Sequence, residues 1–310
     1  MSSEKMNKPA VSIVILNWNG WRDTIECIDS LLNMNYENFN IILLENGSDD
    51  DSYMNIKNNL LKKGKISQER GYEKYIINRI NIYFLILFKN LGFTGGVNHC
   101  IKFISDNLPS DYILLLNNDT TVEENFLNIL IQYSTDDSVL TPKIMYYSNK
   151  NMIWYAGGNF NKFTGTAYHT GINEKDSIKY SNVRDIDYGC GCCLLIPSKI
   201  LQQVGFLDDN FFAYYEDVDF SIRARKNGFK VKFIPQSIIY HKVSRSTSSI
   251  KHFSIYLQTR NMFYIIKKNY SKLTYFLFLF LFFIYKNNIF FFRLFIESKF
   301  TLKIFYNRFK

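Results

Sequence analysis

Short apolar runs alternate with amphipathic stretches through the first half of the chain, and this rhythm constrains the fold more than any other feature. The apolar runs cover residues 11–16, 41–44, 82–88 and 112–116. Such runs are typical of strands buried on both faces. Between them, apolar residues recur at helical spacing, as Ile25, Ile28, Leu31 and Leu32 do.

This alternation of strands and helices predicts an α/β fold with a mostly parallel, doubly wound sheet. We expect helices over residues 23–34, 97–108 and 126–131. Residues 50–81 are polar and lysine-rich, and we expect helix and loop there. Ligands of such sheets bind at the carboxyl ends of the strands, so the segments that follow the apolar runs are the candidate site.

The second half of the chain is less regular. Residues 154–171 are rich in glycine, threonine and aromatic residues, which favours a hairpin or a loop over a cleft. We expect short helices over 198–205 and 217–227, the latter closed by Gly228, and a strand over 229–234.

The composition changes after residue 268, and we divide the chain into a catalytic domain, 1–268, and a hydrophobic helical appendage, 269–310. Residues 273–285 and 289–296 are almost wholly apolar, and each is shorter than the roughly 20 residues that span a bilayer. We interpret them as two amphiphilic helices that lie on a membrane face near basic residues. The alternatives are a buried helical pair, a dimer surface or a tilted span.

Charge and cysteine usage narrow the function classes. The chain of 310 residues has a formal net charge of +9, but it has no arginine-rich tract or nucleic-acid motif, so we expect no nucleic-acid partner. Three of the five cysteines lie in GCGCC, which lacks the spacing of a zinc or redox site. We expect reduced, buried thiols. The N-terminal segment shows no secretory signal pattern, and we expect a cytoplasmic protein.

Two segments after predicted strands suit a nucleotide. Glu45 and Asn46 end the second apolar run, where a carboxylate can accept hydrogen bonds from a base or ribose. The segment KNLGFTGGVN follows the third run and opens a helix. Its glycines let backbone approach a ligand, and a helix N-terminus favours phosphate. A plain turn is the alternative for the first segment.

Acidic residues and one histidine suit metal and proton chemistry. Asp119 follows the fourth apolar run, where a carboxylate beside amides suits Mg²⁺ or Mn²⁺. Glu216 and Asp217 follow an aromatic run that could shield a carboxylate and raise its basicity. His241 leaves a β-like run into a basic, hydroxyl-rich segment that suits diphosphate contact. Helix capping or first-turn charge are the structural alternatives for the carboxylates.

In this order the segments resemble family 2 glycosyltransferases of the GT-A fold, and within it the rhamnosyltransferase-like branch. The matching strings are VSIVILNWNG, LLENGSDD, NLGFTGGVN, YILLLNNDT, DYGCGCCLLIP and GFLDDNFFAYYEDVDFSIRARKNG. The resemblance implies Asp217 as catalytic base with Glu216 as the fallback, and Asp119 and His241 as metal ligands. Glu45 replaces the family's usual aspartate. The donor-binding residues that we predict are Asn17, Asn19, Glu45, Asn46, Lys89, Gly92, Gly96, Asn98, Asn118 and Asp187.

The implied reaction is metal-dependent transfer of a sugar from a nucleotide-diphosphate donor, with inversion, to a hydroxyl of a glycan or polyprenyl-linked glycan. The resemblance favours dTDP-L-rhamnose, with UDP- and GDP-sugars as alternatives. It also implies work on surface polysaccharide. From the hydrophobic C-terminal block we expect a protein peripheral to the inner face of the membrane that works on a polyprenyl-linked glycan, and a homodimer stays open. The competing interpretations are a sugar-phosphate nucleotidyltransferase and a non-catalytic, membrane-associated sugar-nucleotide-binding scaffold.

Overall fold

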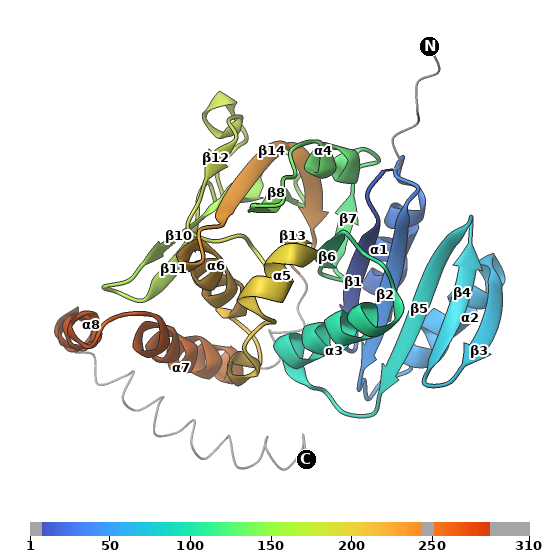
Figure 1. Ribbon diagram of the computed structural model, residues 1–310, viewed down its shortest axis with the longest axis horizontal. Helices are drawn as coiled ribbons and strands as arrows, with labels where there is room; N and C mark the ends of the chain where they lie inside the picture. The colour runs from blue at the N-terminus through green and yellow to red at the C-terminus, as the bar shows by residue number, and fades with distance from the viewer. Residues whose placement is uncertain (1–7, 244–250, 286–310) are drawn as a thin grey trace.

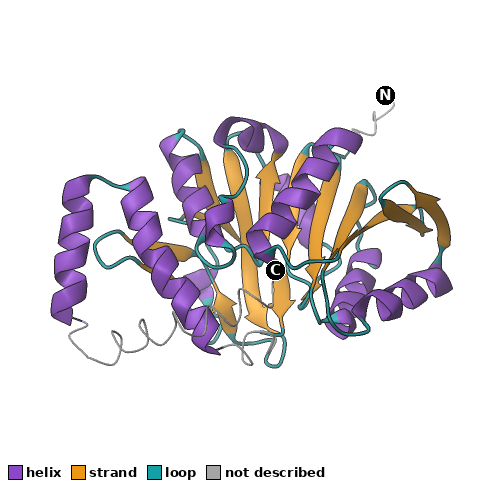
Figure 2. Cartoon of the chain, turned by 90° about the horizontal axis from the view of Figure 1, so that it is seen from below, coloured by secondary structure: helices purple, strands orange, loops and turns teal. Residues whose placement is uncertain are grey.

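The computed structural model of the protein describes residues 8–243 and 251–285. One large sheet runs through it, with helices on both sides (Figures 1 and 2). Four parallel strands form its centre, in the order β6 (Tyr112–Leu116), β1 (Val11–Asn17), β2 (Phe39–Asn46) and β5 (Ile80–Leu87). These are the four apolar runs of the sequence.

The apolar runs follow from burial of the central strands on both faces. In β1, Ile13 and Ile15 join one hydrophobic cluster, whereas Val14 joins the cluster on the opposite face. The first cluster includes residues of α1 (Trp21–Leu32), α2 (Ser52–Lys63) and α4 (Phe126–Gln132). The second includes residues of α3 (Gly92–Asn107), α5 (Ser198–Val204) and α6 (Glu216–Lys226).

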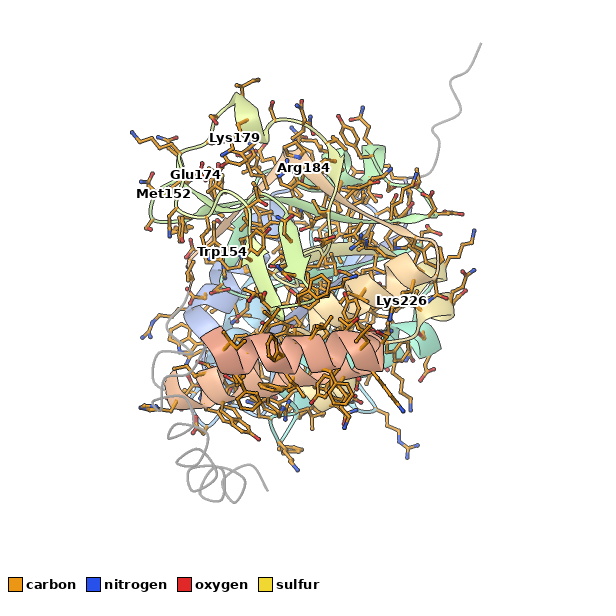
Figure 3. The ribbon with its side chains drawn as sticks, turned by 90° about the vertical axis from the view of Figure 1, so that its left-hand side faces the viewer. Met152, Trp154, Glu174, Lys179, Arg184 and Lys226 are labelled. Atoms are coloured by element: carbon orange, nitrogen blue, oxygen red, sulfur yellow. The ribbon has the colours of Figure 1, made fainter. Side chains whose placement is uncertain are left out.

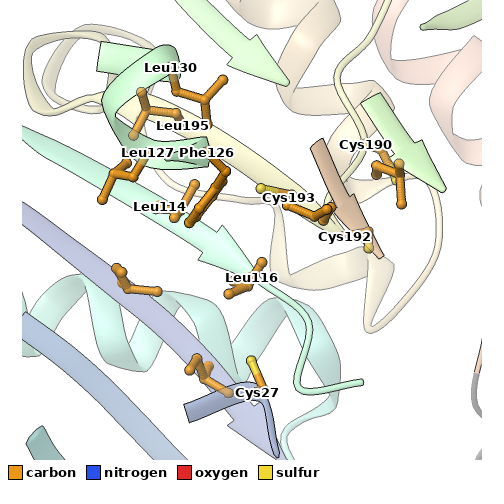
Figure 4. Packing of buried hydrophobic residues seen from close by; sticks show 14 of the residues in the cluster. Cys27, Leu114, Leu116, Phe126, Leu127, Leu130, Cys190, Cys192, Cys193 and Leu195 are labelled. Atoms are coloured by element: carbon orange, nitrogen blue, oxygen red, sulfur yellow. The ribbon is translucent and has the colours of Figure 1, made fainter. Parts of the chain in front are cut away.

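A part of the first cluster shows how a helix covers the sheet (Figure 4). Leu114 of β6 and Leu195 of the neighbouring β13 (Cys193–Pro197) lie beneath Phe126, Leu127 and Leu130 of α4. All five cysteines of the chain are free and buried, as the sequence predicted.

One edge of the sheet differs from the sequence prediction of helix and loop over residues 50–81. There α2 is followed by an antiparallel hairpin of β3 (Lys65–Glu69) and β4 (Tyr72–Ile77), and β4 pairs with β5. Every residue of β3 is exposed, because this strand is the edge of the sheet. It therefore lacks the alternation of apolar and polar residues that marks a half-buried strand.

The other side of the sheet is mixed. Antiparallel β13 lies between β6 and β8 (Ser138–Tyr146), and β14 (Lys230–His241) then pairs parallel with β8. Three short strands pair antiparallel around them: β7 (Thr120–Val122) and β12 (Arg184–Asp185) with β14, and β9 (Ile153–Tyr155) with β8. The α/β fold is thus confirmed, with a parallel centre and largely antiparallel flanks.

The hairpin expected within residues 154–171 is present as β10 (Gly158–Asn161) and β11 (Thr166–His169). Two 3₁₀ turns, η1 (Ile178–Tyr180) and η2 (Asp209–Phe211), complete the connections. The turn η2 leads into the aromatic segment before α6.

Two further helices, α7 (Lys251–Asn269) and α8 (Lys272–Tyr285), lie side by side at one end of the molecule (Figures 1 and 3). Phe278 of α8 is fully buried, and its ring packs edge-on against Phe263 of α7 with centroids 5.0 Å apart. The first predicted C-terminal helix is therefore α8, and the second, over 289–296, lies outside the described residues. Among the helices that the structure describes, none is both long and apolar enough to cross a bilayer.

Candidate active site

A cavity of about 350 Å³ lies at the carboxyl ends of the central strands. Leu16 of β1, Asn46 of β2 and Leu116 of β6 line it where their strands end. This is the place at which open α/β sheets bind ligands. The acidic and amide side chains in its wall are Asn46, Asn90, Asn117, Asn118, Asp119, Glu216 and Asp217.

Strand pairing brings Asp119 to His241. The chain leaves β6, turns at Asn117, whose amide donates to the Cys192 carbonyl at 2.9 Å, and continues into β7. Thr120 at the start of β7 pairs with His241 at the end of β14. Asp119 Oδ1 therefore lies 3.1 Å from His241 Nε2, and both side chains are largely buried.

A neighbouring aromatic side chain fixes the imidazole. Trp154 of β9, labelled in Figure 3, packs edge-on against the His241 ring with centroids 4.4 Å apart, and it also lines the cavity. His241 Nδ1 is buried and has no hydrogen-bond partner among the described residues, so Nε2 is the nitrogen directed at Asp119. The ring is held by packing rather than by a second hydrogen bond within that part of the chain.

The Asp119–His241 pair fits a divalent cation. A carboxylate oxygen and an imidazole nitrogen are both ligands that Mn²⁺ accepts, and Mg²⁺ favours the oxygen. Within residues 8–243 and 251–285, no three His, Cys, Asp or Glu side chains form a metal-binding group. The protein would thus supply few ligands and leave the others to donor phosphates and water, as is usual for Mg²⁺ in phosphate chemistry.

Asp217 lines the same cavity from the first turn of α6. Its Oδ2 accepts a hydrogen bond from the Gly191 amide at 2.9 Å, and its Oδ1 accepts one from the Val218 amide at 2.8 Å. Burial, followed by the charge of nearby Cys190, raises the pKa of Asp217 to about 6 against the opposing effect of the two amides. A carboxylate with this pKa is ionised at neutral pH and is a better proton acceptor than an ordinary aspartate.

Glu216 lies beside Asp217 in the cavity wall but differs from it in hydrogen bonding and in pKa. Its Oε2 is buried without a hydrogen-bond partner among the described residues. Burial, followed by the charge of Asp217, raises the pKa of Glu216 well above its ordinary value. Burial and the charge of Asp217 thus disfavour the ionised form of Glu216, which makes Asp217 the better candidate for the base.

Asn17, Asn19 and Glu45 lie outside the cavity wall and form a hydrogen-bonded network with Ser48 at the carboxyl ends of β1 and β2. Asn17 Nδ2 donates to Glu45 Oε2 at 2.7 Å, and Ser48 donates its amide to Glu45 Oε1 at 2.8 Å. Asn19, which has φ of 53°, exchanges hydrogen bonds with Asp49. Glu45 is almost fully buried, and burial raises its pKa. Its contact with a nucleoside stays a prediction.

The next loop is tied to the end of β2. Asn46 Nδ2 donates to the Gly92 carbonyl at 3.0 Å, and its Oδ1 accepts from the Leu91 amide at 3.1 Å. Gly92 has φ of 75°, and a Cβ there would lie 2.5 Å from Phe212, so no other residue fits easily. Asn46 and Gly92 line the cavity, whereas Lys89 is exposed before this loop.

Three further predicted donor-binding residues, Gly96, Asn98 and Asp187, also lie outside the cavity wall and serve the scaffold. Gly96 lets α3 approach β1, because a Cβ there would lie 2.4 Å from Leu16 Cδ2. Asn98 holds the segment before η2 through hydrogen bonds with Leu207. Asp187 forms an ion pair with Arg225 and accepts from the Phe160 amide. Donor contact by these residues would require a change in those bonds, and their donor-binding role stays a prediction.

Asn118, by contrast, does line the cavity, and its Nδ2 donates to Thr24 Oγ1 at 2.9 Å. Sequence reasoning missed the aromatic and apolar part of the wall. Trp18 stands between the two predicted asparagines, and Phe253 and Leu257 come from α7. The position of Trp18 within the motif was a usable signal. The contribution of α7 was not visible, because it depends on how that helix packs.

The chain is similar in sequence to known glycosyltransferases. The model of the family described as glycosyl transferase family 2 matches residues 12–205, and that of glycosyl transferase family group 2 matches residues 112–304. The chain is 27% identical over 187 residues to the low-salt glycan biosynthesis hexosyltransferase Agl10 of Haloferax volcanii, covering 59% of each protein. It is 24% identical over 234 residues to the rhamnosyltransferase WbbL of Escherichia coli, covering 73% of this chain and 80% of that protein.

Solved structures show the same fold. The mannosyltransferase PcManGT of Pyrobaculum calidifontis, in complex with GDP-Man and Mn²⁺, superposes with a TM-score of 0.59 at 8% identity, covering 87% of this chain and 68% of that one. GalNAc-T7 with UDP, GalNAc and Mn²⁺ has a TM-score of 0.56 at 17% identity, covering 76% of this chain and 44% of that one. These neighbours establish the GT-A fold. Because the family model matches more than half of its residues, the chain belongs to family 2 of the glycosyltransferases.

Proposed function

We propose that the chain transfers a sugar from a nucleoside-diphosphate donor to an acceptor hydroxyl, with inversion and with the help of Mg²⁺ or Mn²⁺. One observation carries the proposal: Asp119 and Asp217 line the same cavity. Asp119 is paired with an imidazole, and Asp217 has a raised pKa. The first suits a cation and its phosphates, and the second suits a proton.

On the donor side, Asp119 and His241 would hold the cation through a carboxylate oxygen and Nε2. When bound, the cation neutralises charge that develops on the departing diphosphate. Asn118 and Asn46 place amide side chains in the same wall, and Gly92 and Phe93 at the start of α3 line it as well. These groups orient the donor with its anomeric carbon toward Asp217.

On the acceptor side, Asp217 accepts the proton of the attacking hydroxyl on its carboxylate. The acceptor oxygen forms the new bond to the anomeric carbon as the bond from that carbon to the phosphate oxygen breaks. Because attack comes from the face opposite the leaving group, one displacement inverts the configuration. The Gly191 and Val218 amides hold the carboxylate in position during the transfer.

For the donor sugar, the favoured candidate is dTDP-L-rhamnose. The Escherichia coli relative is named a rhamnosyltransferase, and a Mycobacterium tuberculosis relative, 34% identical over 64 residues or 21% of each protein, is named an N-acetylglucosaminyl-diphospho-decaprenol L-rhamnosyltransferase. UDP- and GDP-sugars are the alternatives. A donor panel with added metal, read by mass spectrometry for the released nucleotide and the transferred sugar, distinguishes them.

For the acceptor, a polyprenyl-linked glycan at the inner face of the cell membrane is the favoured class. The support is α8, which exposes one continuous apolar stripe while Phe278 faces α7. The stripe consists of Leu273, Phe276, Leu277, Phe280, Phe283 and Ile284. Such a helix fits peripheral contact with lipid. A homodimer that buries the same stripe is the alternative, and sedimentation without lipid tests it.

A non-catalytic scaffold is the second candidate function, because Glu45 is already bonded to Asn17 and Ser48 and the cavity offers only one acidic residue beside the amides of 117–118. Titration calorimetry with a nucleoside diphosphate, with and without Mn²⁺, combined with the donor panel decides between them. Transfer or donor hydrolysis supports the enzyme. Tight, metal-dependent binding with no turnover over the whole panel would favour the scaffold.

A further inference from the structure

The segment between η2 and α6 has a strained backbone. Phe212, Tyr214 and Tyr215 have φ angles of 61°, 68° and 71°, in the left-handed region that bulky residues avoid. Phe212, Ala213 and Tyr214 line the cavity, and Glu216 and Asp217 follow directly. Strain of this kind persists only where surrounding groups hold it, and it is concentrated at functional sites.

One side chain of α7 donates hydrogen bonds to three backbone carbonyls in and beside this segment. Asn261 is completely buried, and its Nδ2 donates to the carbonyls of Phe211, Ala213 and Tyr214 at 3.1, 2.8 and 2.7 Å. Carbonyls of a left-handed segment do not take part in the regular hydrogen bonds of a helix or sheet, so they need donors from other parts of the protein. A single amide thus satisfies three of them.

The amide of Asn261 is itself held. Arg260 Nε donates to Asn261 Oδ1 at 2.8 Å, and Arg260 Nη2 donates to the carbonyls of Asn210 and Phe211 at 2.7 and 2.9 Å. The bond to Oδ1 orients the amide so that its N–H groups face the segment. On the other side, the Thr94 amide donates to the Phe212 carbonyl at 3.1 Å.

We propose that Asn261 is a positioning residue of the transfer reaction, acting through residues 211–215 on Asp217. Its amide holds the strained segment, the segment sets the start of α6, and the start of α6 fixes the Asp217 carboxylate. The same segment forms the aromatic wall of the acceptor side. Asn261 touches neither carboxylate nor the Asp119–His241 pair through any hydrogen bond described. This inference rests on the proposed function.

The expected effect is confined to the chemical step and the acceptor. Replacing Asn261 by alanine removes its hydrogen bonds to the Ala213 and Tyr214 carbonyls, while the Phe211 carbonyl keeps its bond from Arg260, so the segment relaxes and Asp217 moves. Misplacement of a reacting group by about 1 Å costs on the order of 100-fold in rate. We expect kcat to fall by about 10- to 100-fold and the acceptor KM to rise, with donor KM and nucleoside-diphosphate affinity within about twofold of the native protein.

The matched control is Asn269→Ala. Asn269 lies on the same helix, is also buried, and donates to Asp219 Oδ1 at 2.8 Å, away from residues 211–215. We expect this variant to lose thermal stability as Asn261→Ala does, but to keep kcat within about threefold. Arg260→Lys, which keeps the charge and loses the Nε bond to Oδ1, should show a smaller loss of kcat in the same direction as Asn261→Ala.

Hydrogen exchange gives a measurement that does not depend on activity. Peptides that cover 211–219 should exchange faster in Asn261→Ala than in the native chain and in Asn269→Ala, whereas β1 and β6 should not change. Unchanged exchange over 211–219, or a loss of kcat equal to that of the control, would overturn the positioning role. If the native chain shows no transfer with any donor, the proposed function fails, and the exchange result still decides whether Asn261 holds the segment.

Discussion

Gly191 donates its backbone amide to the Asp217 carboxylate at 2.9 Å, and Gly191 itself lies in the wall of the cavity that Asp119 shares. The glycine precedes β13, the antiparallel strand beside β6. Asp119 therefore follows the end of β6, and the amide that binds Asp217 precedes the start of the neighbouring strand β13. Both carboxylates are positioned by the same pair of strands, which is why they face one cavity.

Replacing Asp217 by asparagine should preserve the fold and lower kcat by at least about 100-fold, because general-base contributions are typically of this size. Steady-state transfer with the identified donor measures it, and circular dichroism checks folding. The control is Asp29→Asn, an exposed carboxylate of α1 that pairs with Lys63 outside the cavity. Near-native turnover in the Asp217 variant would remove it from the role of base.

Replacing Glu216 by glutamine separates the two neighbouring acids. Burial and the charge of Asp217 raise the pKa of Glu216 well above its ordinary value, so glutamine reproduces its neutral form at pH 7. We expect kcat to change by less than about fivefold. A loss as large as that in Asp217→Asn would identify Glu216 as the proton acceptor and reverse the two assignments.

The pH dependence of transfer should carry the signature of Asp217. Its pKa is raised to about 6, and the base works only when ionised, so kcat/KM should fall tenfold per unit as pH drops below 6. The fall in kcat/KM below pH 6 should be absent from the residual activity of Asp217→Asn. A profile that is flat down to pH 4.5 would contradict the assignment, because an ordinary aspartate loses its charge only near pH 4.

The same pKa shift predicts a change in stability. A carboxyl whose pKa is higher in the folded than in the unfolded state stabilises the fold at low pH, and this contribution is lost as pH rises through about 6. At pH 7.5, Asp217→Asn should therefore raise the free energy of unfolding by about 1 to 3 kcal/mol. The upper figure is the free energy that corresponds to the whole rise in the pKa of Asp217. Urea denaturation measures it, and at pH 4 the gain should largely vanish.

How far the sequence could predict the site depends on the kind of contact involved. Asp119 and Asp217 were visible, because each follows a local pattern of apolar residues that ends at a carboxylate. That His241 lies against Asp119 depends on the pairing of β7 with β14, which joins segments far apart in the chain, and the resemblance rather than the local pattern supplied it. The Gly191 amide was invisible, because a backbone donor leaves no mark on residue type.

The fold shows the same division. The central strands were predictable, since burial on both faces leaves apolar runs such as 112–116. The exposed edge strand β3 was not, because no face of it is buried. The antiparallel insertion of β13 was also not readable, because a buried strand looks alike in sequence whichever direction its neighbours run.

The metal site can be tested through Asp119 and His241. Asp119→Asn should raise the Mn²⁺ concentration for half-maximal transfer by about tenfold or more, since even the residues behind metal ligands affect affinity by 10- to 100-fold. His241→Ala should act in the same direction. Calorimetric titration of nucleoside diphosphate should lose its dependence on Mn²⁺ in both variants. Binding that stays metal-dependent in both would place the cation elsewhere.

Membrane contact should depend on the exposed stripe of α8. Leu273, Phe276 and Phe280 have exposed fractions of 69%, 65% and 63%, and full burial of such side chains contributes about 1.5 to 3 kcal/mol each. Changing the three to serine should abolish co-sedimentation with anionic phospholipid vesicles, because the strength of binding scales with the apolar area that the helix buries in the lipid. Ile178→Ser is the control, since Ile178 is 86% exposed on η1 rather than on α8.

Deletion of residues 273–310 should release the protein from membrane fractions. Unchanged fractionation after that deletion would refute the membrane role, and a shift from dimer to monomer in the triple variant without lipid would assign the stripe to a second copy of the chain.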